Sequence, residues 1–97
     1  MRYDIVVAPE AVKDVEHLTP YVRAMVRDAI ERSLRHAPTR VSKSRIKRLR
    51  GMSRPQFRLR VDEVRVFYDV REATVDILAV VPKAEAAAWL AREGRMG

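Results

Sequence analysis

The spacing of apolar residues predicts a strand and two helices in the first part of the chain. Residues 3–8 are rich in β-branched side chains, which favour a short strand. Pro9 then suits the first turn of a helix, where its missing N–H leaves no hydrogen bond unmade. Thr19-Pro20 is a second helix start, an N-cap followed by proline at the first helical position. Apolar residues recur at intervals of three and four from there until Pro38 ends the helix.

The second half of the chain changes to the period of a strand. Residues 56–61 and 64–70 alternate around Asp62-Glu63, which predicts a hairpin with a two-residue loop. Residues 74–81 form a third strand, and its last seven positions are almost all apolar, so it is expected at the centre of a sheet. A final helix is predicted from Lys83 to about Glu93.

The element order β-α-α-β-β-β-α predicts one α+β domain over residues 1–97. The helical hairpin and the C-terminal helix are expected on one face of a mainly antiparallel four-stranded sheet. Residues 39–55 have no period and are interpreted as a basic connector, with Ile46 and Leu49 in the core and Gly51 in a turn. The chain has no cysteine, which excludes disulfides and cysteine-based zinc sites, and no apolar stretch approaches the roughly 20 residues of a membrane span.

Charge adds a feature that the apolar pattern does not show. The whole chain carries 20 basic and 13 acidic residues, for a net charge of +7. Eleven of the basic residues and none of the acidic ones lie between Arg32 and Val61, so the rest of the chain holds 9 basic and 13 acidic residues. Asp28/Arg32 and Glu31/Arg35 are spaced as ion pairs on the outer face of the second helix. The run is interpreted as a positively charged surface that attracts an anionic partner. The alternative is that it is a solvated surface that keeps the chain soluble.

The predicted hairpin places part of this charge on one face of the sheet. A turn at Asp62-Glu63 sets Arg60 opposite Arg65 and Arg58 opposite Phe67, with Leu59 and Val66 on the core side. Like charges directly opposite each other are destabilising, and three guanidiniums on one open face suit a phosphate group. For Phe67 two interpretations remain open: it stacks on a base, or it covers the rim of the core.

Four segments together resemble the RelE/ParE superfamily of toxins from type II toxin–antitoxin systems: Arg48-Leu49-Arg50-Gly51-Met52, Phe57-Arg58-Leu59-Arg60-Val61, Val64-Arg65-Val66-Phe67-Tyr68-Asp69-Val70 and Leu78-Ala79-Val80-Val81-Pro82-Lys83. The resemblance covers nearly the whole chain, because the order of elements is also similar. It implies a cytoplasmic toxin in a hetero-oligomer with a cognate antitoxin. The antitoxin's acidic segment would cover the basic face and contact the C-terminal helix.

The resemblance implies one of two activities. RelE-like members cut mRNA in the ribosomal A site without a metal or other cofactor, and ParE-like members inhibit DNA gyrase by protein binding. Arg58, Arg60 and Arg65 fall on the basic triad of RelE-like members, which favours an mRNA endoribonuclease. RelE-type enzymes carry an arginine just after the last strand and often a tyrosine in the last helix. Here Lys83 and Glu85 occupy that region, as candidates for a positive charge and a general base.

Further RNA contacts are expected from the basic run and from the aromatic residue beside the triad: Lys43, Arg45, Lys47, Arg48, Arg50, Arg54 and Phe67. The alternatives to the nuclease are a gyrase inhibitor and an RNA-binding relative with weakened catalysis. His17 and His36 lie near helix ends, where a cation interacts well with the helix dipole, and are expected to have capping roles. Tyr68 is expected in the core, and Trp89 as a packing anchor.

Overall fold

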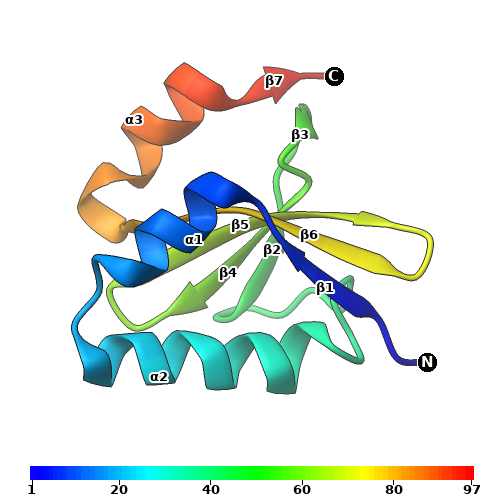
Figure 1. Ribbon diagram of the computed structural model, residues 1–97. Coiled ribbons are helices and arrows are strands. Elements are labelled where there is room, and N and C mark those ends of the chain that lie inside the picture. The colour runs from blue at the N-terminus through cyan, green and yellow to red at the C-terminus, as the bar shows by residue number, and fades with distance from the viewer.

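A five-stranded sheet in the order β1-β6-β5-β4-β2 forms the centre of the computed structural model, which describes residues 1–97 (Figure 1). Its helical part comprises α1 (Pro9–Glu16), α2 (Pro20–Ala29), the π-helical turn η1 (Ile30–Leu34) and α3 (Lys83–Glu93). The strands are β1 (Asp4–Val7), β2 (Ile46–Arg48), β3 (Met52–Arg54), β4 (Phe57–Val61), β5 (Val64–Arg71), β6 (Thr74–Pro82) and β7 (Arg95–Met96). The predicted α+β class and mainly antiparallel sheet are confirmed. None of the helices has the length and apolar character needed to cross a bilayer.

The helical hairpin begins as the sequence pattern predicts, and an arginine side chain joins its two helices. Thr19 is the N-cap of α2, and its Oγ1 accepts a hydrogen bond from the Val22 N–H at 3.4 Å. The Arg23 guanidinium of α2 donates to three carbonyl groups at the end of α1, namely those of Val15, Glu16 and Leu18. The Val15 carbonyl also accepts the Leu18 N–H at 3.1 Å. Carbonyl groups at the end of a helix lack the partners of its interior, so Arg23 joins the two helices by donating to them.

The hairpin of β4 and β5 has the predicted register. Arg60 pairs with Arg65, Leu59 with Val66, and Arg58 with Phe67. Asp62 takes a positive φ of 51° in the turn, a conformation that aspartate tolerates better than most residues. Leu59 and Val66 are completely buried, so the expected core side of the hairpin is confirmed.

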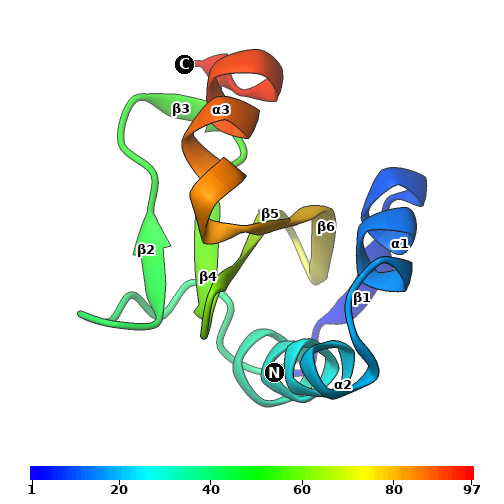
Figure 2. The same cartoon turned by 90° about the vertical axis from the view of Figure 1, so that its left-hand side faces the viewer.

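The helices cover both faces of the sheet, and the expectation of helices on a single face is wrong. α1 and α2 pack on the face that carries Leu59, Val66 and Tyr68. α3 packs on the opposite face, against Phe67 and its neighbours on β6 (Figure 2). β6 is apolar on both sides, so each side needs a helix to exclude water from it.

The basic connector contains two short strands that its sequence does not reveal. β2 pairs with β4 and adds a fifth strand to the expected four. β3 pairs with β7, beyond α3, as a separate two-stranded sheet. Three residues are too few to establish a period of two, so the sequence pattern does not predict these strands. Ile46 is buried, Leu49 is half-buried, and Gly51 lies in a turn with φ of +73°, as expected.

Candidate functional site: a basic strand face beside α3

The basic face lies on the side of the sheet that carries α3. Arg58 and Arg60 project from β4 and Arg65 from β5, on the opposite side from the buried Leu59. Lys47 of β2 pairs directly with Arg58, which adds a fourth cation to this face. The pairing of neighbouring strands therefore brings together four positive groups.

Arg65 is far less accessible than expected. The residue is only 6% exposed, so the prediction that it faces solvent is wrong. Its Nη1 donates to the carbonyl oxygens of Asp62 at 2.8 Å and Val64 at 3.0 Å, and this braces the hairpin turn. The first residue of α3 docks on the same turn, because the Lys83 N–H donates to the Glu63 carbonyl at 2.7 Å. Arg65 thus combines a structural role with a contribution to the positive field.

Arg58 is the electrostatically unfavourable member of the group. It is half-buried, and its Nε is a buried donor without a hydrogen-bond partner. Burial lowers the pKa of its guanidinium, and the positive charges of Arg65 and Arg60 lower the pKa further. Buried donors in folded proteins are nearly always paired, so an unpaired donor beside like charges is an unfavourable feature of this face.

Phe67 is completely buried and is unavailable to a nucleotide base. Its ring stacks on Trp89 of α3, with the ring centroids 4.9 Å apart and the planes at 6°. The interpretation that Phe67 stacks a base is wrong, and the alternative, in which it covers the core, is correct. Trp89 is the packing anchor that the sequence predicts, because it fixes α3 to the sheet next to Arg58, the strand partner of Phe67.

Lys83 and Glu85 lie in the first turn of α3, and both side chains are exposed. The hydrogen bond from Lys83 to Glu63 places this turn beside the Arg60–Arg65 pair. Their expected roles as a positive charge and a general base remain predictions.

The basic run is largely free of acidic partners. Two of its eleven members form the predicted ion pairs, Arg32 with Asp28 and Arg35 with Glu31, and the other nine form none. Lys43, Arg45, Lys47, Arg50 and Arg54 are all exposed. Arg48 is exposed as well, but its Nη1 donates to the Gln56 carbonyl at 2.7 Å and its guanidinium lies over the Phe57 ring.

The remaining predicted roles are structural. The Nδ1–H of His17 donates to the Lys13 carbonyl oxygen at 2.7 Å, at the end of α1, as a capping residue does. Tyr68 is fully buried, and its hydroxyl donates to the Pro38 carbonyl at 2.6 Å. Burial raises the pKa of the Tyr68 hydroxyl.

A sequence model described as the ParE toxin of the type II toxin–antitoxin system parDE matches residues 5–87. The chain belongs to this toxin family. No curated protein matches its sequence.

Solved structures of related toxins have the same fold as this toxin. The toxin–antitoxin complex RelBE2 from Mycobacterium tuberculosis contains a chain 27% identical, with a TM-score of 0.70 over 84% of this chain and 99% of the other. A mutant of the E. coli toxin RelE in its free state is 24% identical, with a TM-score of 0.70 over 94% and 93% of the two chains. The RelB–RelE complex from Methanococcus jannaschii contains a chain 21% identical, with a TM-score of 0.68 over 87% and 96%.

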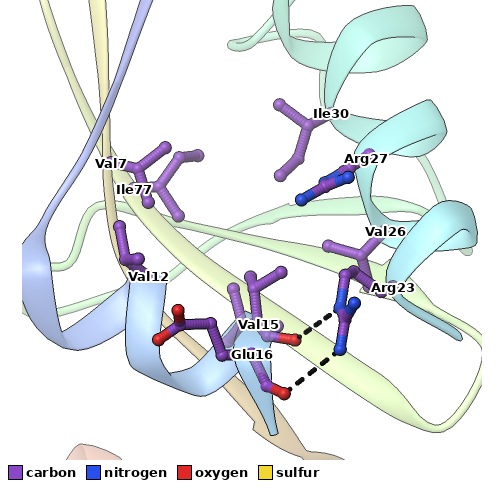
Figure 3. A pocket seen from close by; sticks show the side chains of 10 residues that line it. Val7, Val12, Val15, Glu16, Arg23, Val26, Arg27, Ile30 and Ile77 are labelled. Carbon is purple, nitrogen blue, oxygen red and sulfur yellow. Dashed lines mark hydrogen bonds between the residues drawn. The ribbon is translucent and has the colours of Figure 1, made fainter. Parts of the chain in front are cut away.

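The toxin has a second surface feature, which the sequence did not reveal. An apolar cleft of about 620 Å³ lies between α1, α2 and the sheet (Figure 3). Seven valine and isoleucine side chains line it, together with Glu16, Arg23 and Arg27. Val7 and Val12 on its wall are 40% and 44% exposed, so this cleft leaves apolar surface in contact with water.

Proposed function

We propose that this toxin is an mRNA endoribonuclease that acts on ribosome-bound message, and therefore works in the cytoplasm. The observation that carries the proposal is the half-buried Arg58, whose buried Nε is unpaired and which is flanked by Arg60 and Arg65. A phosphodiester at this position would supply the missing acceptor and the missing negative charge. The likeness to the toxin chain of the RelBE2 complex supports the RelE-like branch of the superfamily.

The proposed reaction is an attack by the RNA 2′-hydroxyl on the neighbouring phosphorus. The 2′-oxygen loses its proton to the Glu85 carboxylate and forms a bond to phosphorus, while the bond to the 5′-oxygen breaks. The products are a 2′,3′-cyclic phosphate and a 5′-oxygen that takes up a proton from water. The negative charge that builds up on the phosphate oxygens is stabilised by Arg58, Arg60 and Lys83. The buried Arg65 adds to the positive electrostatic potential at the same place.

The same proposal assigns the rest of the basic run to the RNA backbone. Side chains that are exposed and unpaired are free to contact phosphates of the RNA. They are Lys43, Arg45, Lys47, Arg50 and Arg54. Arg48 contributes less, since carbonyl groups of the protein already occupy its guanidinium.

The proposed partner of the toxin is a cognate antitoxin. Chains with this fold occur in complexes with RelB antitoxins. An acidic antitoxin segment over the basic run and against α3 would neutralise nine unpaired cations and give a toxin–antitoxin hetero-oligomer. The apolar cleft between α1 and α2 offers this partner an apolar anchor, which the basic run lacks.

A second candidate function is inhibition of DNA gyrase by protein binding. The observation that favours it is the description of the matching family, which is ParE. In that case the basic face would bind protein or DNA and would have no chemistry of its own.

Two assays after induction of the toxin separate the candidates. The nuclease predicts new 5′ ends in translated mRNA, seen by primer extension, and their loss in the Arg58→Met variant. The gyrase inhibitor predicts intact mRNA and a block of DNA supercoiling that survives Arg58→Met. Cells that are killed with intact mRNA and blocked gyrase would refute the nuclease.

A further inference from the structure

A basic cleft of about 400 Å³ lies between η1 and the loop that follows it. Three arginines and three serines provide most of its wall: Arg32, Arg40, Arg45, Ser33, Ser42 and Ser44. No aspartate or glutamate lines it. None of these residues belongs to the strand face of Arg58 and Arg65, so the cleft is a separate feature of the surface.

A smaller cleft of about 220 Å³ connects this feature to the strand face. It shares Arg32 and Arg45 with the basic cleft, and Arg60 of β4 also lines it. The Arg60 N–H donates to the Arg45 carbonyl at 2.8 Å, which joins the loop directly to β4. A continuous line of cations therefore leads from Arg40 through Arg45 to Arg60. Two carboxylates, Asp28 and Asp62, also line the smaller cleft. Asp28 forms an ion pair with Arg32, whereas Asp62 forms no ion pair with the arginines of this line.

The side chains of the basic cleft have donors available for a ligand. Those of Arg40 and Arg45 form no hydrogen bond or ion pair within the chain, while Arg32 keeps its bond to Asp28. Ser42 Oγ accepts the N–H groups of Arg45 and Ile46 at 3.0 and 3.2 Å, which leaves its own hydroxyl hydrogen free to donate. Guanidinium and hydroxyl donors around one space match the several acceptor oxygens of a phosphate group.

We propose that this cleft binds the phosphate backbone of double-stranded RNA, away from the site of cleavage. The cleft has no aromatic side chain for an unpaired base and few apolar side chains to anchor a peptide. The apolar cleft between α1 and α2 has the opposite character and suits a protein partner better. A structured RNA held here and along Arg45 and Arg60 would orient the toxin on a large ribonucleoprotein target.

The proposal extends the nuclease function but concerns binding alone, so its test uses RNA that cannot be cleaved. The probe is a fluorescent RNA hairpin with 2′-O-methyl groups throughout, which keeps the duplex form and removes the attacking hydroxyl. Its affinity for the full-length toxin is measured by anisotropy over a series of salt concentrations. Arg40→Ala/Arg45→Ala is compared with Lys13→Ala/Arg92→Ala, a control that removes the same charge from α1 and α3.

The Arg40→Ala/Arg45→Ala variant is expected to bind the hairpin about 10-fold more weakly at low salt than the control variant. Each lost phosphate contact reduces the slope of log affinity against log salt concentration by about 0.9. Loss of two contacts is therefore expected to reduce this slope by about 1.8. Ser44→Ala removes a donor but no charge, and is expected to lower affinity by a few-fold while the slope stays the same. Both arginine side chains are exposed and unbonded, so the variants are expected to fold normally.

Equal affinities and slopes for the two double variants would overturn the proposal. A loss of antitoxin affinity in Arg40→Ala/Arg45→Ala, with hairpin binding unchanged, would also overturn it and assign the cleft to the protein partner. A wild-type toxin that binds the hairpin but cuts no message refutes the nuclease and leaves this inference standing. A toxin that cuts message while Arg40→Ala/Arg45→Ala binds the hairpin like the control refutes only this inference.

Discussion

Replacing Arg58 by methionine is expected to make the toxin more stable and much less active. Methionine keeps most of the unbranched side-chain stem that packs on the sheet, and it removes the guanidinium. In the folded state that guanidinium carries a buried Nε without a partner and lies beside two other arginines. In the unfolded chain it is hydrated and is not held beside Arg65, so folding bears the cost of desolvation and of the repulsion from Arg65.

The size of the gain follows mainly from the unpaired donor. Leaving a buried donor unsatisfied costs about 1–3 kcal/mol, and the half-buried position of Arg58 argues for the lower half of that range. Repulsion from Arg60 and Arg65 is screened by solvent and adds only tenths of a kcal/mol. A gain of about 1–2 kcal/mol in the free energy of unfolding raises the Tm of a domain this small by roughly 4–15 °C. Loss of one contact to the charge of the transition state lowers the cleavage rate by about 100-fold.

The assay compares Arg58→Met with Arg60→Met in thermal unfolding and in cleavage of translated mRNA. Arg60 lies on the same face and carries the same charge, but it is exposed, so its loss tests charge alone. Arg58→Met is expected to have the higher Tm of the two variants. If Arg58→Met is no more stable than the wild type, or if it cuts mRNA at the normal rate, the unpaired Nε is not a phosphate site.

Three further changes test the structural roles derived above. Arg65→Ala is expected to lower the free energy of unfolding by about 1–3 kcal/mol in a denaturant titration, because it leaves two turn carbonyls without their donor; an unchanged midpoint would show that Arg65 acts only through its charge. Arg23→Met should lower the free energy of unfolding by a similar amount and increase amide hydrogen exchange at the end of α1. Protection equal to that of the wild type would contradict the role of Arg23 in joining α1 to α2. Tyr68→Phe is expected to lose about 1 kcal/mol at pH 7 with the hydrogen bond to Pro38. Burial raises the Tyr68 pKa above its unfolded value of about 10, so its contribution is complete below pH 10 and falls as the pH rises above it. Tyr68→Phe should therefore lose less stability than the wild type between pH 10 and 12, and parallel losses would contradict the assigned burial.

Local chemistry was enough to predict the hairpin and the helix starts. A two-residue loop between alternating strands leaves one register, and a shift by one residue would have turned Leu59 and Val66 out of the core. The residues that flank the helices, such as Thr19 and Pro20, likewise act within their own turn. These predictions depend on neighbours in the chain, and the structure confirms them.

Burial of the site residues depended on contacts between distant segments. An alternation of apolar and polar residues predicts which side of a strand each residue faces, but it does not predict what covers that side. Phe67 and Arg65 point to the predicted side, and α3 together with the hairpin turn encloses them. Residues 75–81 are apolar on both faces, and that signal, followed further, requires a helix on each side of the sheet.

The sequence by itself determined the element types, the strand register and the position of the basic run, because these depend on residue order and on short-range sterics. Only the tertiary structure decided which cations are accessible, and it left Arg58 half-buried with an unpaired donor and Arg40 and Arg45 in an open cleft. That outcome depends on how α3 and the loop after η1 pack against the sheet. Packing of this kind is set by side chains far apart in sequence, and a local pattern contains no record of it.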